Sequence, residues 1–185
     1  MDKLKNFLDM ITGQFDNSEQ FNKLQGEEAK KFPFAKHINT ICNDKINNLP
    51  ENFEGVFFLE ESYYTTNGKK HAAPHLFLFT EKEEGIQLDS YEIPEGYNND
   101  SFTYDNLTPV DYSELKKSEK FTPAIYKLKD NVWEGGSVSN FSPVVKFTLF
   151  ERFSPEVLEV SESMEVNGKR TFGFDEPILY KRIVK

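Results

Sequence analysis

The chain has 185 residues, a formal net charge of −9, 18 Phe and a single cysteine, Cys42. One domain spanning residues 1–185 accounts for this length, and such a domain buries roughly two-thirds of its unfolded surface without disulfides. The acidic balance excludes a nucleic-acid binder and tight binding to an anionic membrane, because both require clustered Lys and Arg. The lone thiol fits a reducing compartment, and no apolar run approaches the roughly 20 residues of a membrane span. We therefore expect a cytoplasmic protein whose partners are small molecules or other proteins.

Residues 1–30 are expected to form short helices that pack on the rest of the domain. The first helix is predicted by apolar residues at three-and-four spacing, and Gly13 follows them as a helix C-cap. A second helix is expected to start at once, capped by Asp16 with Glu19 or by Asn17 with Gln20. The apolar positions of the first helix are Leu4, Phe7, Leu8 and Ile11.

Residues 36–185 show the pattern of an antiparallel sheet, in which short alternating segments are separated by Asn-Gly, Gly-Gly and Asp-Asn turn signals. Residues 94–120 are polar and are predicted to be a long surface excursion with a short helix near 112–117. The close spacing of roughly eight to ten strands predicts a mainly β fold, a calyx-like antiparallel β-barrel. The expected strands cover residues 55–64, 75–81, 85–93, 125–128, 132–138, 144–153, 157–166, 169–174 and 178–183.

Two adjacent glutamates, Glu60 and Glu61, lie on the first long strand, so alternation sends them to opposite faces and only one can enter a cup. Glu61 shares its face with Phe57 and Tyr63, and a carboxylate on such an apolar stripe is a candidate proton donor with a raised pKa. The alternative is an ion pair with an arginine or a place at the barrel mouth. Glu162 also lies on an apolar strand face, and the same two alternatives apply to it: a proton donor with a raised pKa, or an ion-pair or barrel-mouth residue.

His75 starts an apolar strand and shares its face with Phe77, which makes it a candidate ligand contact; the alternative is a strand-end imidazole held by a hydrogen bond. The three histidines have no metal-like spacing, so no metal site is expected. Trp133 precedes Gly135 and Gly136, where a bulge or close backbone approach is favoured. Trp133 is either a stacking residue for a ligand or a large core aromatic.

Three segments in order along the chain carry a family resemblance: residues 13–20, the hairpin at 126–137 and the C-terminal segment at 167–182. Together they resemble chromophore lyases of the CpcT/CpeT type. The first segment fits the pattern Gly-x-Phe-(Ser/Asp)-Asn-x-x-Gln of that family. The family's strand ending in Glu-Gln is matched at residues 58–63, with Glu60 kept and Glu61 in place of the Gln.

The resemblance implies a barrel whose aromatic cup holds a linear tetrapyrrole, a bilin, and delivers it to a cysteine of a phycobiliprotein client. No other cofactor is required. Cationic or tyrosyl groups at the rim would orient the ligand's propionates. With Glu61 and His75 as the candidate catalytic pair, the expected pocket residues are Phe57, Glu60, Tyr63, Phe77, Trp133, Arg152, Arg170 and Phe172.

The chain departs from the family pattern at the strand that follows Pro74. A Pro-Tyr-Arg-x-Arg run is typical there, and this chain has His75, Leu76, Phe77 and Leu78 instead, without either arginine. The alternative to a lyase is therefore a non-enzymatic, lipocalin-like binder of small hydrophobic ligands, or a packed barrel that serves a protein partner.

Overall fold

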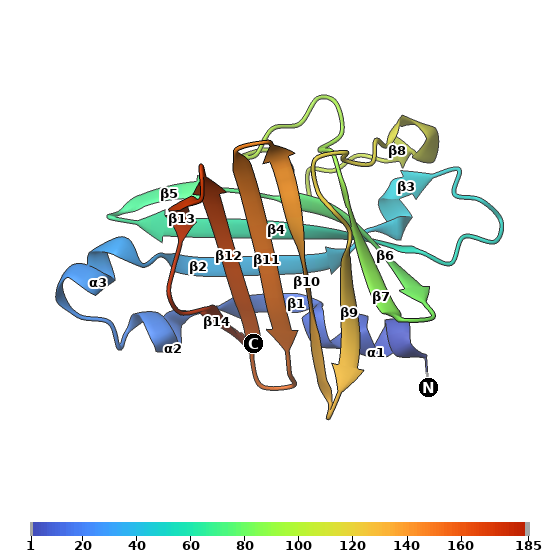
Figure 1. Ribbon diagram of the computed structural model, residues 1–185. Coiled ribbons are helices and arrows are strands. Elements are labelled where there is room, and N and C mark those ends of the chain that lie inside the picture. The colour runs from blue at the N-terminus through green and yellow to red at the C-terminus, as the bar shows by residue number, and fades with distance from the viewer. Residues whose placement is uncertain (1, 184–185) are drawn as a thin grey trace.

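The computed structural model describes residues 2–183, and its main feature is a closed barrel of ten antiparallel strands (Figure 1). Each strand pairs with the next barrel strand along the chain, and pairing of the last strand with the first completes the ring. The expected mainly β, calyx-like barrel is thus confirmed. The ring consists of β1 (Gly13–Asp16), β2 (Phe34–Ile41), β4 (Val56–Thr66), β6 (His75–Lys82), β7 (Gly85–Tyr91), β9 (Ala124–Lys129), β10 (Val132–Ser142), β11 (Val145–Phe153), β12 (Leu158–Val166) and β14 (Ile178–Arg182).

Two-residue turns with left-handed backbone at both residues join hairpin strands at three places. Asn67 and Gly68 have φ angles of 50° and 72° and lead into β5 (Lys69–Ala72), which pairs with the end of β4. An equivalent Asn-Gly turn joins β12 to β13 (Lys169–Gly173), and Asp130-Asn131 joins β9 to β10 with both φ angles positive. Asn, Asp and Gly tolerate this left-handed backbone, whose twist matches that of the flanking strands.

The N-terminal segment contains a barrel strand that the sequence pattern did not predict. Helix α1 (Lys3–Ile11) ends before β1, and helix α2 (Ser18–Phe21) follows β1, so the two helices do not abut. Gly13 has a φ of 130° and opens β1 rather than capping a helix. A Cβ at Gly13 would lie 2.5 Å from the guanidinium of Arg182 on β14, which shows how closely the first and last strands approach. The barrel therefore begins at residue 13 and not at residue 36.

Of the two pairs expected to cap the second helix, Asn17 and Gln20 have longer-range partners, whereas Asp16 accepts from the Ser18 amide at 3.0 Å. The Asn17 side chain donates to the Pro33 carbonyl at 3.0 Å and accepts from the Ala35 amide at 2.8 Å. Gln20 accepts from the amide of Leu179 at 2.9 Å, on β14. These bonds fasten the segment of α2 and α3 (Gly26–Lys31) to β2 and β14.

Helix α1 closes one end of the barrel (Figure 1). Its residues Phe7, Leu8 and Ile11 are buried, which is the apolar face predicted from the sequence. The Phe7 ring lies 5.1 Å from Tyr126 and 5.3 Å from Trp133, measured between ring centroids. These contacts make an aromatic floor beneath the barrel interior.

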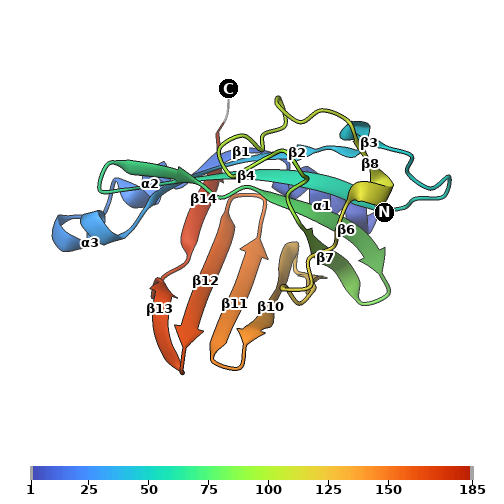
Figure 2. The same ribbon diagram turned by 90° about the horizontal axis from the view of Figure 1, so that it is seen from above.

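A second core lies outside the barrel, under the excursion between β7 and β9. The excursion carries β8 (Val110–Asp111) and a short 3-10 helix, η2 (Tyr112–Glu114), which covers the first part of the short helix expected at 112–117. Strand β8 pairs in parallel with β3 (Ile46–Asn47), which follows the 3-10 turn η1 (Asn43–Lys45). Figure 2 shows β3 and β8 on the opposite side of β4 and β6 from β10 to β12. The buried members of this core are Cys42, Ile46, Phe57, Leu59, Leu76, Leu78, Phe102 and Leu107.

Candidate functional site

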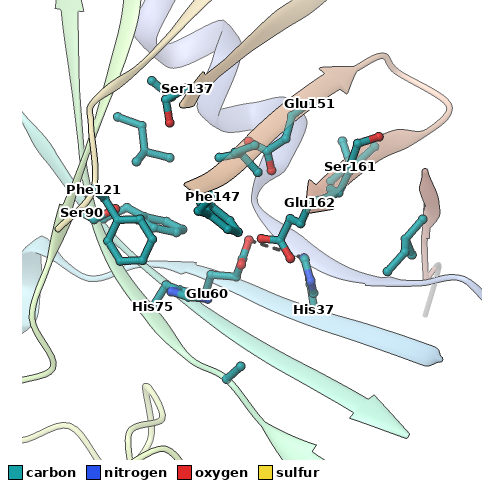
Figure 3. A pocket seen from close by; sticks show the side chains of 18 of the residues that line it. His37, Glu60, His75, Ser90, Phe121, Ser137, Phe147, Glu151, Ser161 and Glu162 are labelled. Atoms are coloured by element: carbon teal, nitrogen blue, oxygen red, sulfur yellow. Dashed lines mark ion pairs between the residues drawn. The ribbon is translucent and has the colours of Figure 1, made fainter. Parts of the chain in front are cut away.

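The barrel interior encloses a cavity of about 390 Å³ above the floor made by α1 (Figure 3). This volume lies within the range of roughly 300–1,000 Å³ that is typical of small-molecule sites. Most of the wall is apolar, with side chains from strands on all sides of the barrel: Phe58, Phe77, Phe79, Leu88, Leu149, Phe153, Leu158, Val160, Met164 and Ile178.

Strand alternation decides which of the two adjacent glutamates enters the cavity. Glu60 lines it, whereas Glu61 points to the outer face and lies against the excursion. Glu61 accepts hydrogen bonds from the Tyr63 hydroxyl at 2.7 Å and from the Tyr104 amide at 3.1 Å. Assigning Glu61 to the cup interior was therefore wrong, because the face shared with Phe57 and Tyr63 packs against the second core and its surroundings.

His75 lies in the cavity wall, as the sequence predicted for a ligand contact, and its role there stays a prediction. Its ring stacks on Phe77 at 5.3 Å with an interplanar angle of 6°. Burial lowers the pKa of His75, and the nearby Glu60 raises it by a smaller amount. The balance favours a neutral imidazole.

The other expected pocket residues separate into three locations. Trp133 is buried in the floor, where its Nε1 donates to Asn6 Oδ1 at 3.1 Å, which agrees with the core alternative. Arg152 faces outward and pairs with Glu134 at 2.7 Å, and Arg170 pairs with Asp175 at 2.6 Å. Both arginines were expected in the pocket, and neither lines it. Phe172, in contrast, lines the cavity at its mouth and is 49% exposed.

Three carboxylates from different strands converge on the cavity: Glu60 on β4, Glu151 on β11 and Glu162 on β12 (Figure 3). Burial raises the pKa of Glu151 to about 8. Burial, followed by repulsion from Glu60, raises the pKa of Glu162 to about 7. The described residues offer Glu162 neither a hydrogen-bond donor nor a cationic partner, whereas Glu151 accepts a hydrogen bond from the Tyr126 hydroxyl.

The sequence reasoning missed Glu151. Strict alternation along residues 144–153 puts residue 151 on the same face as Leu149 and Phe153. The sequence signal for Glu151 is its position between Leu149 and Phe153 on the apolar face of the strand, where a charged residue indicates a functional side chain.

His37 and Asn39 on β2 complete the polar part of the site. His37 Nδ1 lies 3.4 Å from Glu60 Oε2, and Ser62 donates a hydrogen bond of 2.9 Å to Glu60 Oε1. The Asn39 amide nitrogen donates to the Ile11 carbonyl at 2.9 Å. Nε2 of His37 and Oδ1 of Asn39 are buried without a partner. The pKa of His37 is lowered, chiefly by burial.

The mouth of the cavity is aromatic and has a cation at its rim. Phe121, Phe141 and Phe147 pack on one another with centroid distances of 5.2–5.8 Å. Lys120 Nζ lies 4.3 Å from the centre of the Phe141 ring. Lys120 is the sole lysine or arginine among the cavity-lining residues of the described chain.

Comparison with known proteins adds nothing to this geometry. No family model, curated protein or solved structure matches the chain. Among the residues whose side chains the structure describes, no group of three or more His, Cys, Asp or Glu is arranged to hold a metal ion. None of the helices described is long and apolar enough to cross a membrane.

Proposed function

We propose that the barrel binds one flat, mainly apolar small molecule inside its cavity. The observation that supports this most directly is the cavity itself: about 390 Å³, closed by an aromatic floor at one end and entered through an aromatic mouth at the other. Apolar walls with a few convergent polar groups are what a small-molecule site requires. A barrel packed only with its own side chains would leave no such volume.

An open-chain tetrapyrrole is the ligand we would test first, because of the family resemblance. Its pyrrole N–H groups would find acceptors in Glu60 and Glu162, and its propionates would remain at the mouth near Lys120. Cys42 is buried in the second core, away from the cavity wall, so a chromophore lyase of this design would use a cysteine of a phycobiliprotein client.

A binder without lyase chemistry is the second candidate. It is favoured by the position of Arg152 and Arg170, which pair with carboxylates away from the cavity and leave the ligand's anionic groups with Lys120 alone. Such a protein would hold its ligand as a lipocalin-like barrel does, without transferring it.

Spectroscopic titration with biliverdin and phycocyanobilin tests the proposal. Binding should shift and sharpen the visible band of the pigment. Ser137→Phe, which fills the cavity from β10, should abolish the shift, whereas Val138→Phe on the outer face of the same strand should preserve it. His75→Ala should weaken the shift.

Three results discriminate between the candidates. Equal shifts in the two phenylalanine variants would place the pigment outside the cavity. Absence of any shift at saturating protein would remove bilins as ligands. Transfer of the pigment to a phycobiliprotein subunit would support the lyase, and tight binding without transfer would support the binder.

A further inference from the structure

The polar groups deep in the cavity are mostly hydrogen-bond acceptors. Glu60, Glu151 and Glu162 contribute carboxylates from three strands, and Figure 3 shows the Glu60 and Glu162 carboxylates directed toward one another near His37. Like charges this close repel, and burial strengthens the repulsion because the surroundings screen it poorly.

The cavity lining that the structure describes supplies no lysine or arginine deep enough to compensate these carboxylates. Lys120 is the sole Lys or Arg in the described cavity lining, and it stands at the mouth against Phe141. The nearest candidate inside is His37, and burial lowers its pKa, so its imidazole tends to be neutral. Where these carboxyls are ionised, the positive charge that balances them therefore has to come from outside the chain, and without it Glu151 and Glu162 retain protons, in agreement with their raised pKa values.

Two buried groups beside the carboxylates also lack a partner. His37 and Asn39 are each 4% exposed and line the cavity, and their Nε2 and Oδ1 atoms accept no hydrogen bond. His37 Nδ1 faces Glu60, so the proton of a neutral imidazole lies on Nδ1 and Nε2 is left as an acceptor. The Asn39 amide nitrogen is already used by the Ile11 carbonyl, which leaves its oxygen free. Buried acceptors without donors are costly, and a ligand that donates hydrogen bonds would satisfy them.

We infer that the molecule bound in this cavity carries a protonated nitrogen, and that Glu60 and Glu162 hold it as a cation beside the free acceptors of His37 and Asn39. This inference rests on the proposed ligand-binding function and specifies the chemical class of the ligand: an aromatic or alicyclic amine, amidine or protonated pyrrolic system. The apolar wall holds its body and the acceptor cluster holds its charged end.

The same geometry selects against fatty acids and other apolar anions. A carboxylate placed beside Glu60 and Glu162 would add a third like charge in a poorly screened site and would satisfy neither free acceptor. An anion can pair with Lys120 only by staying at the mouth. Discrimination between ligands of one shape but opposite charge is therefore the property that distinguishes this cavity from a general hydrophobic pocket.

Three probes with one ring system test the inference: naphthylmethylamine, methylnaphthalene and naphthoate, titrated calorimetrically into the whole protein near pH 8. The amine should bind on the order of tenfold to a hundredfold more tightly than the neutral hydrocarbon, and naphthoate more weakly than both. Glu162→Gln should reduce the preference for the amine over the hydrocarbon by on the order of tenfold. Glu159→Gln is the matched control, since Glu159 lies on the same strand but does not line the cavity and instead faces Arg152.

The outcomes distinguish failure of the inferred preference for cationic ligands from failure of the proposed ligand-binding function. Equal affinity for the amine and the hydrocarbon, or tighter binding of naphthoate, overturns the inference and leaves the ligand-binding barrel in place. Failure of all three probes to bind overturns both. If Glu162→Gln fails to fold, Glu60→Gln gives the same comparison, and an unchanged amine preference in the folded variant overturns the assignment.

Discussion

His37 Nδ1 lies 3.4 Å from Glu60 Oε2, diagonally across the pair formed by β2 and β4, and both side chains line the cavity. The imidazole also packs on Tyr180, with ring centroids 4.0 Å apart. This contact determines which imidazole nitrogen is free to meet a ligand. It also ties the electrostatics of the site to the stability of the barrel, because His37 is the basic side chain in contact with Glu60, and burial lowers the pKa of His75, the other imidazole that interacts with this carboxylate.

We expect His37 and Glu60 to be energetically coupled. His37→Leu should lower the free energy of unfolding by about 2–3 kcal/mol, because it leaves the Glu60 carboxylate half-buried with Ser62 as its remaining donor. Adding Glu60→Leu should recover part of this loss. Urea denaturation of the two single variants and the double variant measures the coupling, and strictly additive losses would contradict it.

Stability should fall as pH rises from about 4.5 to about 8. The folded-state pKa values of Glu162, about 7, and Glu151, about 8, lie above the ordinary glutamate pKa of 4.5, so the folded protein binds protons more tightly at these carboxyls than the unfolded chain. Their stabilising contribution is complete below the unfolded pKa and is lost as pH rises through the folded values. The lowered pKa values of His37 and His75 act in the opposite direction, but only below the ordinary histidine pKa of 6.5.

Glu162→Gln should remove part of this pH dependence. The variant should be more stable than the parent by about 1–3 kcal/mol near pH 8.5 and show no gain near pH 4.5. Thermal or urea unfolding across this range measures the difference, with Glu159→Gln expected to follow the parent curve. A constant difference at all pH values would indicate a packing effect instead of ionisation.

The floor formed by α1 should be essential for stability and should report through Trp133. Phe7→Ala removes a fully buried ring that contacts Tyr126 and Trp133, so we expect a loss of about 3–5 kcal/mol. Trp133 is the single tryptophan, and its emission should shift to the red as water enters the floor. Phe150→Ala, on the outer face of β11 where the ring is 48% exposed, should leave both stability and emission nearly unchanged.

Cys42 should be unreactive in the folded protein. The residue is 0% exposed in the second core, and burial raises the pKa of its thiol to about 12, so little thiolate exists at neutral pH. Ellman's reagent should modify it at a rate limited by unfolding and should react rapidly in denaturant. Rapid modification of the native protein would show that the excursion detaches from β4 and β6.

Local patterns were enough to predict most of the barrel. The alternation over residues 144–153 and the Asn-Gly and Asp-Asn pairs mark strands and turns through short-range sterics, and these features depend little on the rest of the chain. The family resemblance pointed to the same calyx-like architecture. His75 lies in the cavity wall on the same face of its apolar strand as Phe77, and its expected place there came from the family resemblance, because an apolar run does not show which face is inward.

Long-range strand pairing determined the parts of the barrel and of the site that local patterns did not predict. Residues 13–16 become a strand because they pair with β2 on one side and with β14 at the other end of the chain, a choice that no local signal encodes. The sequence established that Glu60 and Glu61 face opposite ways, but only the excursion packed on the outer face determined which of them enters the cavity. The cluster of Glu60, Glu151 and Glu162 likewise forms when the ring closes, because closure aims side chains from separate strands at one enclosed volume.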